Sequence, residues 1–453
     1  MTRARVHLLT IGDELLSGDV VDRNKAWLGA RCRALGLEVI RATTVRDREP
    51  EIIAAITAAA AEADLCLVSG GLGPTTDDLT AAAVARAAGV ALVRDPDLAA
   101  RLTAFFSARA PALIETNLKQ ADLPAGATVL ANPIGTAAGF AVELPRPAGS
   151  ADASARGCWL CSMPGVPREL HKMMAEQVEP RVRERFELAP IPRRVYRAIG
   201  SGESSVQHNV RDVIAAARQR SPGLANLLVH YRARSPEVQL ILEATPGADG
   251  SPGATAEELA SLDAALAAAI GPALYHVGAS AGDGDDGSTS TDTELDSAAH
   301  LVVARLTARG LTLVSAESCT GGGLGAAITA IPGSSACFLG GVIAYANAVK
   351  IAQLGVDPAA LETEGAVSEP VARQMAEGAR ERLGATIGVA TTGIAGPGGA
   401  TETKPVGTVD VAVATPQSTL YKRLRLHGGR DAVRHAATQW ALKLILDQLE
   451  ALP

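Results

Sequence analysis

Several kinds of residue are scarce in this 453-residue chain, and each shortage excludes a class of protein. Aromatic residues make up only 3% of the sequence, so the cores must be built mainly from Ala, Val and Leu. The six cysteines are scattered, mostly within apolar segments, which is typical of reduced, buried thiols and not of a disulfide framework. Basic residues do not exceed acidic ones, and the net charge of −7 argues against a general nucleic-acid binder.

Membrane and export signals are also missing. The apolar run at residues 6–11 is too short for a signal peptide. No charged residue lies between Glu317 and Lys350, and this uncharged run exceeds the roughly 20 residues that cross a bilayer. However, the glycines at 321–323 and the Pro332-Gly333 pair would interrupt a helix and leave backbone groups unsatisfied in lipid. We therefore expect a cytoplasmic protein that has no membrane segment.

Residues 1–175 alternate predicted strands with predicted helices. Apolar runs at residues 5–11, 37–42 and 64–69 read as strands, and the segments 22–35 and 50–62 read as helices. Such alternation implies a parallel sheet covered by helices on both faces. In these sheets ligands bind beyond the carboxyl ends of the strands.

Two acidic, glycine-bearing loops follow predicted strands here, at residues 11–18 and 70–78. Glycines let backbone N–H groups approach a phosphate, and carboxylates can hold a divalent cation that bridges phosphates. The adjacent aspartates at 77 and 78 would equally suit the N-cap of a helix that begins at Leu79. The candidate residues are Gly71 and Gly73 for phosphate and Asp13, Asp77 and Asp78 for the metal.

The middle of the chain has a different pattern. Residues 190–277 read as a small α+β domain, and residues 278–293 have the composition of a flexible linker. The Ala-, Ser- and Gly-rich stretch at 146–157 is predicted to be a mobile hairpin insertion. Residues 294–453 form the third predicted domain.

In the third domain the residue pattern suggests a site along the uncharged run. Leu311 to Ser315 reads as a strand, after which Ser318, Thr320, Gly321 and Gly322 form a turn that opens a helix, where unpaired N–H groups attract anions. Ser334 and Ser335 precede a second strand that leads to Tyr345 and Lys350. A serine is a weak nucleophile near pH 7 and needs a base, for which a buried lysine such as Lys350 is a candidate. Ordinary turns and a solvated lysine are the plain alternative.

A later loop carries further binding candidates. The glycine-rich segment 393–399, with Gly393 and Gly396, offers backbone donors to a ribose or a phosphate. Lys404 and Arg430 are the nearest cations for a 5′-phosphate, which an arginine can bind in a bidentate way. Alternatively, Arg430 caps the preceding turn.

The chain resembles the CinA family in both its first and its last domain. The C-terminal resemblance rests on six blocks in order: AESCTGG at 316–322, PGSS at 332–335, YANAVK at 345–350, GAVSE at 365–369, TGIAGPGG at 392–399 and KPVGT at 404–408. It implies hydrolysis of nicotinamide mononucleotide to nicotinate mononucleotide and ammonia, with no cofactor. In that family the second serine of PGSS is taken as the nucleophile. The resemblance thus assigns Ser335 as nucleophile, Lys350 as base and Tyr345 as an aid to proton movement.

The N-terminal half resembles the molybdopterin-binding fold family. Besides the two loops, the match includes NLKQ at 117–120, NPIGT at 132–136 and PGVPRE at 164–169. It implies ADP-ribose pyrophosphatase activity with a divalent metal (Co²⁺ or Mg²⁺) and K⁺, and it adds Asn117 and Lys119 to the substrate contacts. For the middle domain the resemblance suggests a KH-like fold. The segment Gly200-Ser-Gly202 lacks the G-x-x-G loop that an RNA clamp needs.

One departure from the family and two alternatives remain open. The family has Gly-Asp-Arg where this chain has Gly428-Gly429-Arg430, so Arg430 lacks its expected acidic partner. The first alternative is a chain in which only the pyrophosphatase is active and the C-terminal domain merely binds. The second is a non-enzymatic nucleotide-sensing partner in DNA uptake or repair. We expect small nucleotides as ligands, no nucleic acid, no membrane, and a homodimer.

Overall fold

The computed structural model describes residues 3–107, 109–146, 157–188, 190–247, 251–279 and 297–452. The described residues fold into two compact units, one that ends at Ile191 and one that begins at Pro192. The predicted hairpin at 146–157 and the predicted linker at 278–293 lie almost wholly outside the described residues. The boundaries of the three predicted domains therefore stay a prediction.

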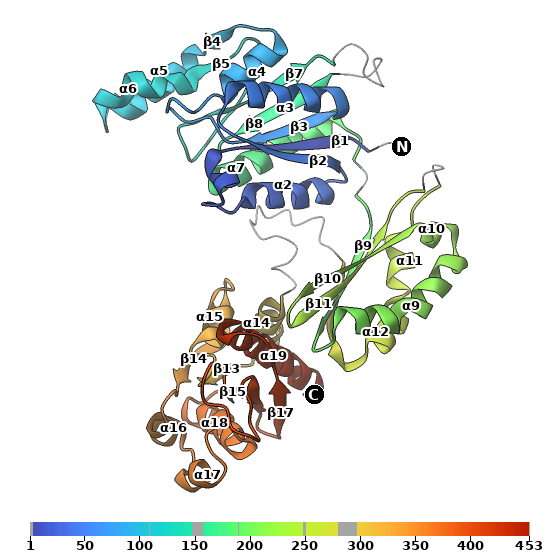
Figure 1. Ribbon diagram of the computed structural model, residues 1–453, viewed down its shortest axis with the longest axis vertical. Helices are drawn as coiled ribbons and strands as arrows, with labels where there is room; N and C mark the ends of the chain where they lie inside the picture. The colour runs from blue at the N-terminus through green and yellow to red at the C-terminus, as the bar shows by residue number, and fades with distance from the viewer. Residues whose placement is uncertain are drawn as a thin grey trace. The chain divides into compact units, whose positions relative to one another are not determined.

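The first unit is built on a six-stranded sheet of order β2-β1-β3-β8-β7-β6 (Figure 1). Neighbouring strands from β2 to β8 are parallel, and β7 and β6 continue the sheet in antiparallel pairs. The predicted parallel sheet is thus confirmed, with an antiparallel edge added. The strands are β1 (Arg5–Ile11), β2 (Glu38–Val45), β3 (Leu65–Ser69), β6 (Thr128–Leu130), β7 (Gly139–Leu144) and β8 (Cys158–Met163).

Helices cover both faces of this sheet, as the alternating pattern predicts (Figure 1). One core lies under α3 and α4, and a second lies under α2 and α7. A two-stranded sheet of β4 (Leu92–Arg94) and β5 (Asp122–Pro124) stands beside α5. The helices are α1 (Asp13–Ser17), α2 (Arg23–Ala34), α3 (Glu49–Glu62), α4 (Thr80–Ala88), α5 (Pro96–Ser107), α6 (Ile114–Asn117), α7 (Pro167–Met173) and α8 (Glu179–Arg185), with the short helices η1 (Pro111–Leu113), η2 (Leu118–Ala121) and η3 (Met174–Val178).

The second unit begins with a four-stranded antiparallel sheet of order β10-β11-β9-β12. It confirms the predicted small α+β fold of the middle region. Gly200 lies in the segment that was compared with the RNA-binding loop of KH domains. It packs so closely on Trp440 that a Cβ at Gly200 would lie 2.2 Å from the indole ring. The elements are β9 (Arg193–Ile199), α9 (Glu203–Arg220), α10 (Pro222–Ala225), β10 (Leu227–Arg234), β11 (Glu237–Ala244), α11 (Ala256–Ala260), α12 (Asp263–Ile270), η4 (Gly271–Ala273) and β12 (Leu274–Ala279).

The rest of the second unit is a five-stranded sheet of order β14-β13-β15-β16-β17. Its first three strands are parallel and the last two are antiparallel. One core lies under α14, α15 and α19, and another under α16 and α18. The elements are α14 (Ala298–Ala308), β13 (Leu313–Glu317), α15 (Gly323–Thr329), η5 (Ser334–Ala336), β14 (Phe338–Ile343), α16 (Asn347–Leu354), α17 (Pro358–Thr363), α18 (Glu369–Arg382), β15 (Ile387–Gly393), β16 (Thr408–Ala414), β17 (Thr419–Arg425) and α19 (Arg430–Ala451).

The structure also bears on two expectations from the sequence, the state of the cysteines and the lack of a membrane segment. All six cysteines are free and buried, as expected. Burial raises the pKa of the Cys158 thiol to about 12, so it is protonated at neutral pH. Across the described ranges, no helix combines the length and the apolar character that crossing a membrane requires.

Candidate active site

The side chains of Lys350 and Ser318 meet at the carboxyl ends of the parallel strands β13 and β14. Ser318 directly follows β13, and Lys350 lies on α16, which begins four residues after β14 ends. Lys350 Nζ lies 2.8 Å from the Ala344 carbonyl oxygen, 3.1 Å from the Tyr345 carbonyl oxygen and 3.2 Å from Ser318 Oγ. Both side chains are buried, with Lys350 1% exposed. The sequence pattern thus identified the lysine correctly as the buried cation of the run.

The surroundings of Lys350 favour its neutral amine. Burial is the main cause that lowers the pKa of Lys350 below its usual value, because desolvation disfavours the ammonium. A neutral amine has two N–H donors and one lone pair. Lys350 Nζ is the donor to both carbonyl oxygens and to Ser318 Oγ. Once the amine loses a proton, its two N–H groups suffice for the carbonyls, and its lone pair can accept from the Ser318 hydroxyl. This arrangement suits a lysine that takes a proton from a serine.

The structure places the other two members of the expected catalytic set elsewhere. Ser335 lies in η5 with an exposed side chain and does not contact Lys350 among the described residues. The hydroxyl that the lysine reaches is Ser318, which the sequence pattern places among the substrate contacts. Tyr345 is 62% exposed, and it reaches Lys350 through its backbone carbonyl. Its hydroxyl accepts a hydrogen bond from Arg430 Nη2 at 3.2 Å.

The expected anion site at the start of α15 is occupied by the protein's own carboxylate, which corrects that prediction. Glu317, 1% exposed, accepts hydrogen bonds from the backbone N–H groups of Leu324 at 3.0 Å and Gly325 at 2.8 Å. Thr320 Oγ1 donates to the same carboxylate at 2.8 Å, so this hydroxyl points inward and not toward a substrate. The carboxylate satisfies the free amides of the first helical turn.

Gly321 and Gly322 shape the turn between Ser318 and α15. Their φ angles of +59° and +92° lie in the left-handed region, which a side chain disfavours. Arg434 Nη2 on α19 donates to the Thr320 carbonyl oxygen at 2.9 Å and fastens this turn from the other side. The contribution of Gly321 and Gly322 is therefore to allow the backbone conformation of this turn.

The two remaining C-terminal cations, Arg430 and Lys404, both donate hydrogen bonds to uncharged oxygen atoms. Arg430 Nη1 donates to the Gly396 carbonyl oxygen at 2.9 Å, while Nη2 reaches Tyr345. These two contacts replace the acidic partner that the sequence lacks at position 429. Lys404 Nζ donates to the Glu364 carbonyl oxygen at 2.6 Å, at the end of α17. Gly393 ends β15, where a Cβ would lie 2.7 Å from Val409.

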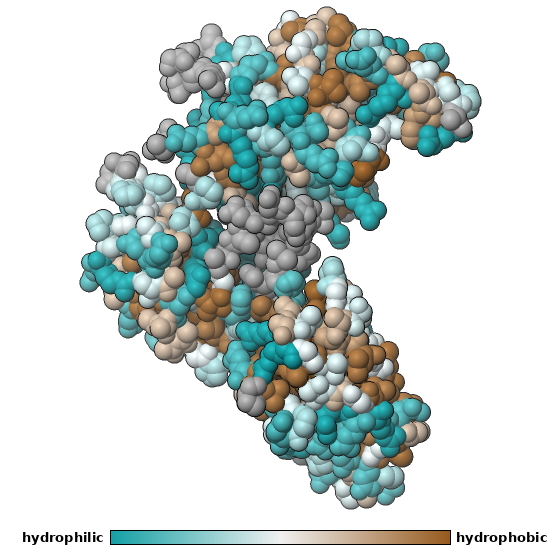
Figure 2. All heavy atoms as spheres, turned by 180° about the vertical axis from the view of Figure 1, so that it is seen from behind, coloured by the Kyte–Doolittle hydropathy of each residue, from teal (hydrophilic) through white to brown (hydrophobic). Residues whose placement is uncertain are grey.

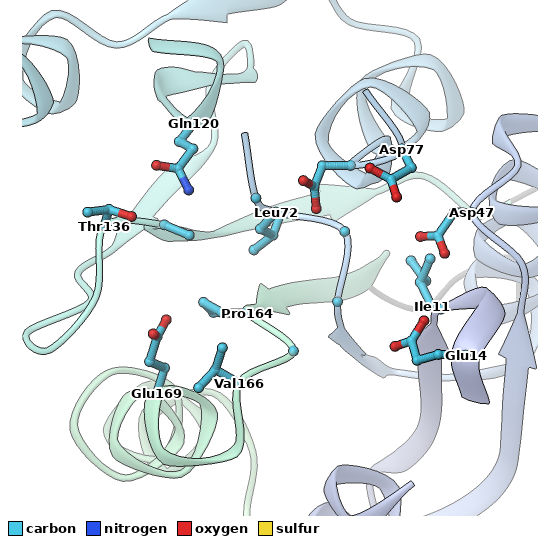
Figure 3. A pocket seen from close by; sticks show the side chains of 17 residues that line it. Ile11, Glu14, Asp47, Leu72, Asp77, Gln120, Thr136, Pro164, Val166 and Glu169 are labelled. Carbon is cyan, nitrogen blue, oxygen red and sulfur yellow. The ribbon is translucent and has the colours of Figure 1, made fainter. Parts of the chain in front are cut away.

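The first unit contains a cavity of about 410 Å³ beyond the carboxyl ends of β1, β3 and β8 (Figure 3). Figure 3 shows acidic side chains at one end and Gln120, Thr136 and Glu169 at the other, with Leu72 and Pro164 between them. None of the described residues that line it is basic. The lining residues are Ile11, Gly12, Glu14, Asp47, Gly70, Gly71, Leu72, Gly73, Asp77, Asp78, Gln120, Thr136, Ala137, Pro164, Gly165, Val166 and Glu169.

The acidic end contains two of the three predicted metal ligands. Asp77 and Asp78 line it, and both accept hydrogen bonds from Thr75 Oγ1, the second at 2.6 Å. Asp13 contributes its backbone N–H, which donates to Asp47 Oδ2 at 2.9 Å. The pKa of Asp47 is raised, first by burial and then by neighbouring carboxylates that include Glu14.

These carboxylates do not by themselves make a metal centre. Among the described residues, no group of three or more His, Cys, Asp or Glu side chains is arranged to hold a metal ion. The predicted trio of Asp13, Asp77 and Asp78 therefore does not form one. Burial is the main cause that raises the pKa of Asp47, and the neighbouring carboxylates add a repulsion that a cation would relieve.

Of the other predicted substrate contacts in the N-terminal half, two line the cavity and two do not. Gly71 and Gly73 line the cavity as expected. Asn117 is buried and its Nδ2 donates to the Leu113 carbonyl oxygen at 2.8 Å. Lys119 Nζ donates to the Thr75 carbonyl oxygen, so it braces the loop that carries Asp77.

The prediction missed Asp47 and Gln120 as parts of the site. Asp47 follows the end of β2 as Asp13 follows β1, so the rule on the carboxyl ends of parallel strands would have found it. Gln120 is 7% exposed, and its Oε1 has no hydrogen-bond partner within the part of the chain that the structure describes. Gln120 can contact a ligand only because η2 faces the cavity, and the sequence around Gln120 does not indicate that orientation.

Two protein families match the two α/β parts. Residues 7–184 match the family described as "Probable molybdopterin binding domain", and residues 295–449 match the "CinA C-terminal domain". The chain therefore joins a molybdopterin-binding fold to a CinA C-terminal domain, and the α/β class predicted for these two parts is confirmed. The KH-like fold of the middle region stays a prediction.

Relatives match along the whole chain. The chain is 42% identical over 441 residues to a CinA-like protein from Anaeromyxobacter dehalogenans, with 97% of this chain and 98% of the relative covered. It is 38% identical over 458 residues to a CinA-like protein from Parasynechococcus marenigrum, with both chains fully covered. The chain belongs to the family of CinA-like proteins. A solved structure, the competence/damage inducible protein CihA from Agrobacterium tumefaciens, is 41% identical and covers 35% of this chain and 96% of its own, with a TM-score of 0.34.

Proposed function

We propose that the C-terminal domain is an amide hydrolase in which Ser318 is the nucleophile and Lys350 the base. The observation that carries the proposal is the buried Lys350 amine held between two backbone carbonyls and the Ser318 hydroxyl. This pairing transfers the nucleophilic role from Ser335, which the family resemblance suggested, to Ser318. Membership of the CinA family supports the reaction type.

The proposed reaction has two stages: an ester forms on Ser318 with release of ammonia, and the ester is then hydrolysed. Ser318 Oγ attacks the carboxamide carbon while its proton passes to Lys350 Nζ. The C–N bond then breaks, and the proton returns from Lys350 to the departing nitrogen, which leaves as ammonia. Water, deprotonated by the same amine, next attacks the Ser318 ester. The C–O bond to Ser318 breaks, the proton returns from Lys350 to Ser318 Oγ, and the carboxylic acid leaves.

Nicotinamide mononucleotide is the proposed substrate, as the family resemblance implies. Its phosphate needs a cation near the site that is not buried in an ion pair. Arg430 is exposed and is held beside Tyr345 by neutral oxygen atoms, so its charge is available to an anion. Lys404 also donates to a neutral oxygen, the Glu364 carbonyl, but its side chain is only partly exposed, so it is the second candidate.

Two serine variants test this assignment directly. Ser318→Ala should lower ammonia release from nicotinamide mononucleotide by a factor of about 10³ or more, since the nucleophile is lost. Ser335→Ala is the matched control and should keep activity within about twofold, because its side chain is exposed and away from Lys350. The opposite result would restore Ser335 as nucleophile. If neither variant affected a measurable turnover, a serine mechanism would be excluded.

For the N-terminal domain we propose metal-dependent hydrolysis of the ADP-ribose pyrophosphate. The acidic cavity favours this second function, because a pyrophosphate can enter a pocket lined by Glu14, Asp47, Asp77 and Asp78 only with a cation. These carboxylates would hold a divalent ion, which neutralises phosphate charge when bound. Since the described carboxylates form no complete metal site, we propose that the phosphate oxygens supply the missing ligands.

The test is ADP-ribose turnover by the full chain with Mg²⁺ or Co²⁺ and after chelation. Asp77→Asn should abolish metal-dependent turnover, whereas Asp97→Asn, an exposed aspartate on α5 outside the cavity, should keep it. Turnover that survives chelation, or an unaffected Asp77→Asn, would refute the metal role. Both outcomes are independent of the amidase assay.

A further inference from the structure

The long helix α19 presents a row of polar side chains to the candidate active site. Arg430, Arg434 and Thr438 follow one another at intervals of four residues, so they lie on one face of the helix. Figure 1 shows α19 beside α15, the helix that begins where the turn carrying Ser318 ends. Thr438 Oγ1 lies 3.1 Å from the place where a Gly323 Cβ would be. The reaction proposed above uses Arg430 but gives no role to Arg434.

The main contact of Arg434 is with the turn that carries Ser318. Its Nη2 donates to the Thr320 carbonyl oxygen at 2.9 Å. Its Nη1 lies 3.9 Å from Asp431 Oδ1, but Asp431 is 98% exposed, so this ion pair contributes little. The face of the C-terminal part seen in Figure 2 mixes hydrophilic with hydrophobic side chains, so a partly exposed arginine is ordinary there. The hydrogen bond to the turn is therefore the feature that distinguishes Arg434.

One peptide unit connects Arg434 to Ser318. The carbonyl of this unit belongs to Thr320 and accepts from Arg434, and its N–H belongs to Gly321. The Gly321 N–H donates to the Ser318 carbonyl oxygen at 3.2 Å. Because a peptide unit is planar, its C=O and N–H rotate together. When the guanidinium holds the carbonyl, it therefore also orients the N–H that closes the turn on Ser318.

This peptide unit benefits from a restraint because a glycine follows it. Gly321 has a φ of +59°, and without a Cβ it can adopt other backbone conformations easily. The Thr320 hydroxyl is held by Glu317 at 2.8 Å, which fixes the side chain but not the plane of the next peptide. The Thr320 carbonyl also accepts from the Gly323 N–H, at 3.2 Å. The shorter, charged hydrogen bond from Arg434 adds a restraint from a distant part of the chain.

We propose that Arg434 is a positioning residue for the nucleophile Ser318. Through the Thr320–Gly321 peptide it keeps the Ser318 backbone in place, so that Ser318 Oγ stays 3.2 Å from Lys350 Nζ. The inference rests on the proposed role of Ser318 as nucleophile. Placement matters because a shift of about 1 Å in a reacting group can cost a factor of about 10² in rate. Arg434 does not touch the reacting atoms, so it acts on the rate of the chemical step and not on substrate affinity.

Arg434→Met tests the inference, because Met keeps an apolar stem and lacks the N–H donors. In the full chain, kcat for ammonia release from nicotinamide mononucleotide should fall by about 10², while KM stays within about twofold. Arg434→Lys keeps a positive charge and one donor group, and should return kcat to within about tenfold of the native value. An increase in KM alone would make Arg434 a substrate contact and overturn the proposal.

Arg218→Met is the matched control. Arg218 Nη2 donates to the Leu227 carbonyl oxygen at the same distance of 2.9 Å, in the middle region and away from Ser318. Each variant loses one hydrogen bond of this kind, so urea unfolding should show similar losses of unfolding free energy. Arg218→Met should nevertheless keep kcat within about twofold. Equal losses of activity in Arg434→Met and Arg218→Met would show a general effect of stability and refute the positioning role.

A second assay separates this inference from the proposed amide hydrolysis. p-Nitrophenyl acetate acylates an activated serine: the Ser318 Oγ–acetyl bond forms, the Ser318 proton passes to Lys350, and p-nitrophenolate leaves. We expect acylation of the native full chain at Ser318, and acylation of Arg434→Met about 10² times more slowly. Equal rates for these two proteins would overturn the positioning role alone. No acylation of the native chain, or acylation that Ser318→Ala does not reduce, would overturn the nucleophile and the positioning role together.

Discussion

Replacing Lys350 with Met tests the centre of the proposed mechanism, because Met has a similar length but no basic nitrogen. The amine nitrogen that lies 3.2 Å from Ser318 Oγ would be lost. Removing a general base slows a reaction by a factor of about 10² to 10⁴, which corresponds to about 3 to 5 kcal/mol of transition-state stabilisation. We expect ammonia release to fall by about 10³. A Lys350→Met variant that kept more than a tenth of the native rate would refute the reasoning.

The same substitution should leave the fold intact. The Ala344 and Tyr345 carbonyls would lose their donor, at a cost of about 1 to 3 kcal/mol for each oxygen left unsatisfied. The substitution also removes the free-energy cost of burying the amine, which offsets part of this loss. The net change in unfolding free energy should therefore be a few kcal/mol at most, measurable by urea unfolding. A variant that does not fold would require the pH test that follows.

The native enzyme offers that test through its pH dependence. Burial lowers the pKa of Lys350 below the usual 10.5, so the folded protein binds fewer protons than the unfolded chain between the lowered pKa and 10.5. The unfolding free energy associated with this group must then rise with pH across that window. In the same way, kcat/KM should rise tenfold per pH unit below the lowered pKa and level off above it. A flat profile from pH 6 to 10 would contradict a lysine base.

Three further substitutions have defined outcomes. Glu317→Gln should destabilise the protein by about 2 kcal/mol in urea unfolding, because one amide cannot accept from both N–H groups at the start of α15. Tyr345→Phe removes a partner of Arg430 and should raise KM for nicotinamide mononucleotide with little change in kcat; a fall in kcat alone would instead support a role for the hydroxyl in proton transfer. Asp47→Asn should raise the melting temperature at pH 7 without metal, since burial and neighbouring carboxylates raise the pKa of Asp47 and make its charged form unfavourable. This gain should shrink as the pH falls through the raised pKa of Asp47, because the native carboxyl then becomes protonated. An unchanged melting temperature at pH 7 would refute the repulsion.

The outline of the fold was predictable because its signals are local. Alternation of apolar strands and amphipathic helices at residues 5–69 is enough to predict a parallel sheet with two covered faces. The antiparallel additions, β7 and β6, were not predicted, since pairing direction depends on how a long connection folds back. The free, buried cysteines follow from their apolar neighbours.

The site was predictable in its residue types but not in its pairs. An uncharged run that ends in a lysine predicts that this lysine is buried, and Lys350 is buried; its role as a base stays a proposal. The choice of nucleophile could not be made from spacing, because Ser318 is 32 residues away from Lys350 and Ser335 only 15. Parallel pairing of β13 with β14 brings the distant serine to the lysine, whereas Ser335 lies before β14, at its opposite end.

The sequence by itself determined which residues this protein can use: a charge-free segment that carries three serines and ends in one lysine, and carboxylates after successive strands. The tertiary structure decided which of them act together. It brings Ser318 to Lys350, uses Glu317 to fill the helix start that the sequence left open to an anion, and adds Asp47 to the acidic cavity. The physical reason is that hydrogen bonds and desolvation depend on distances of a few ångströms, which strand order sets and sequence separation does not.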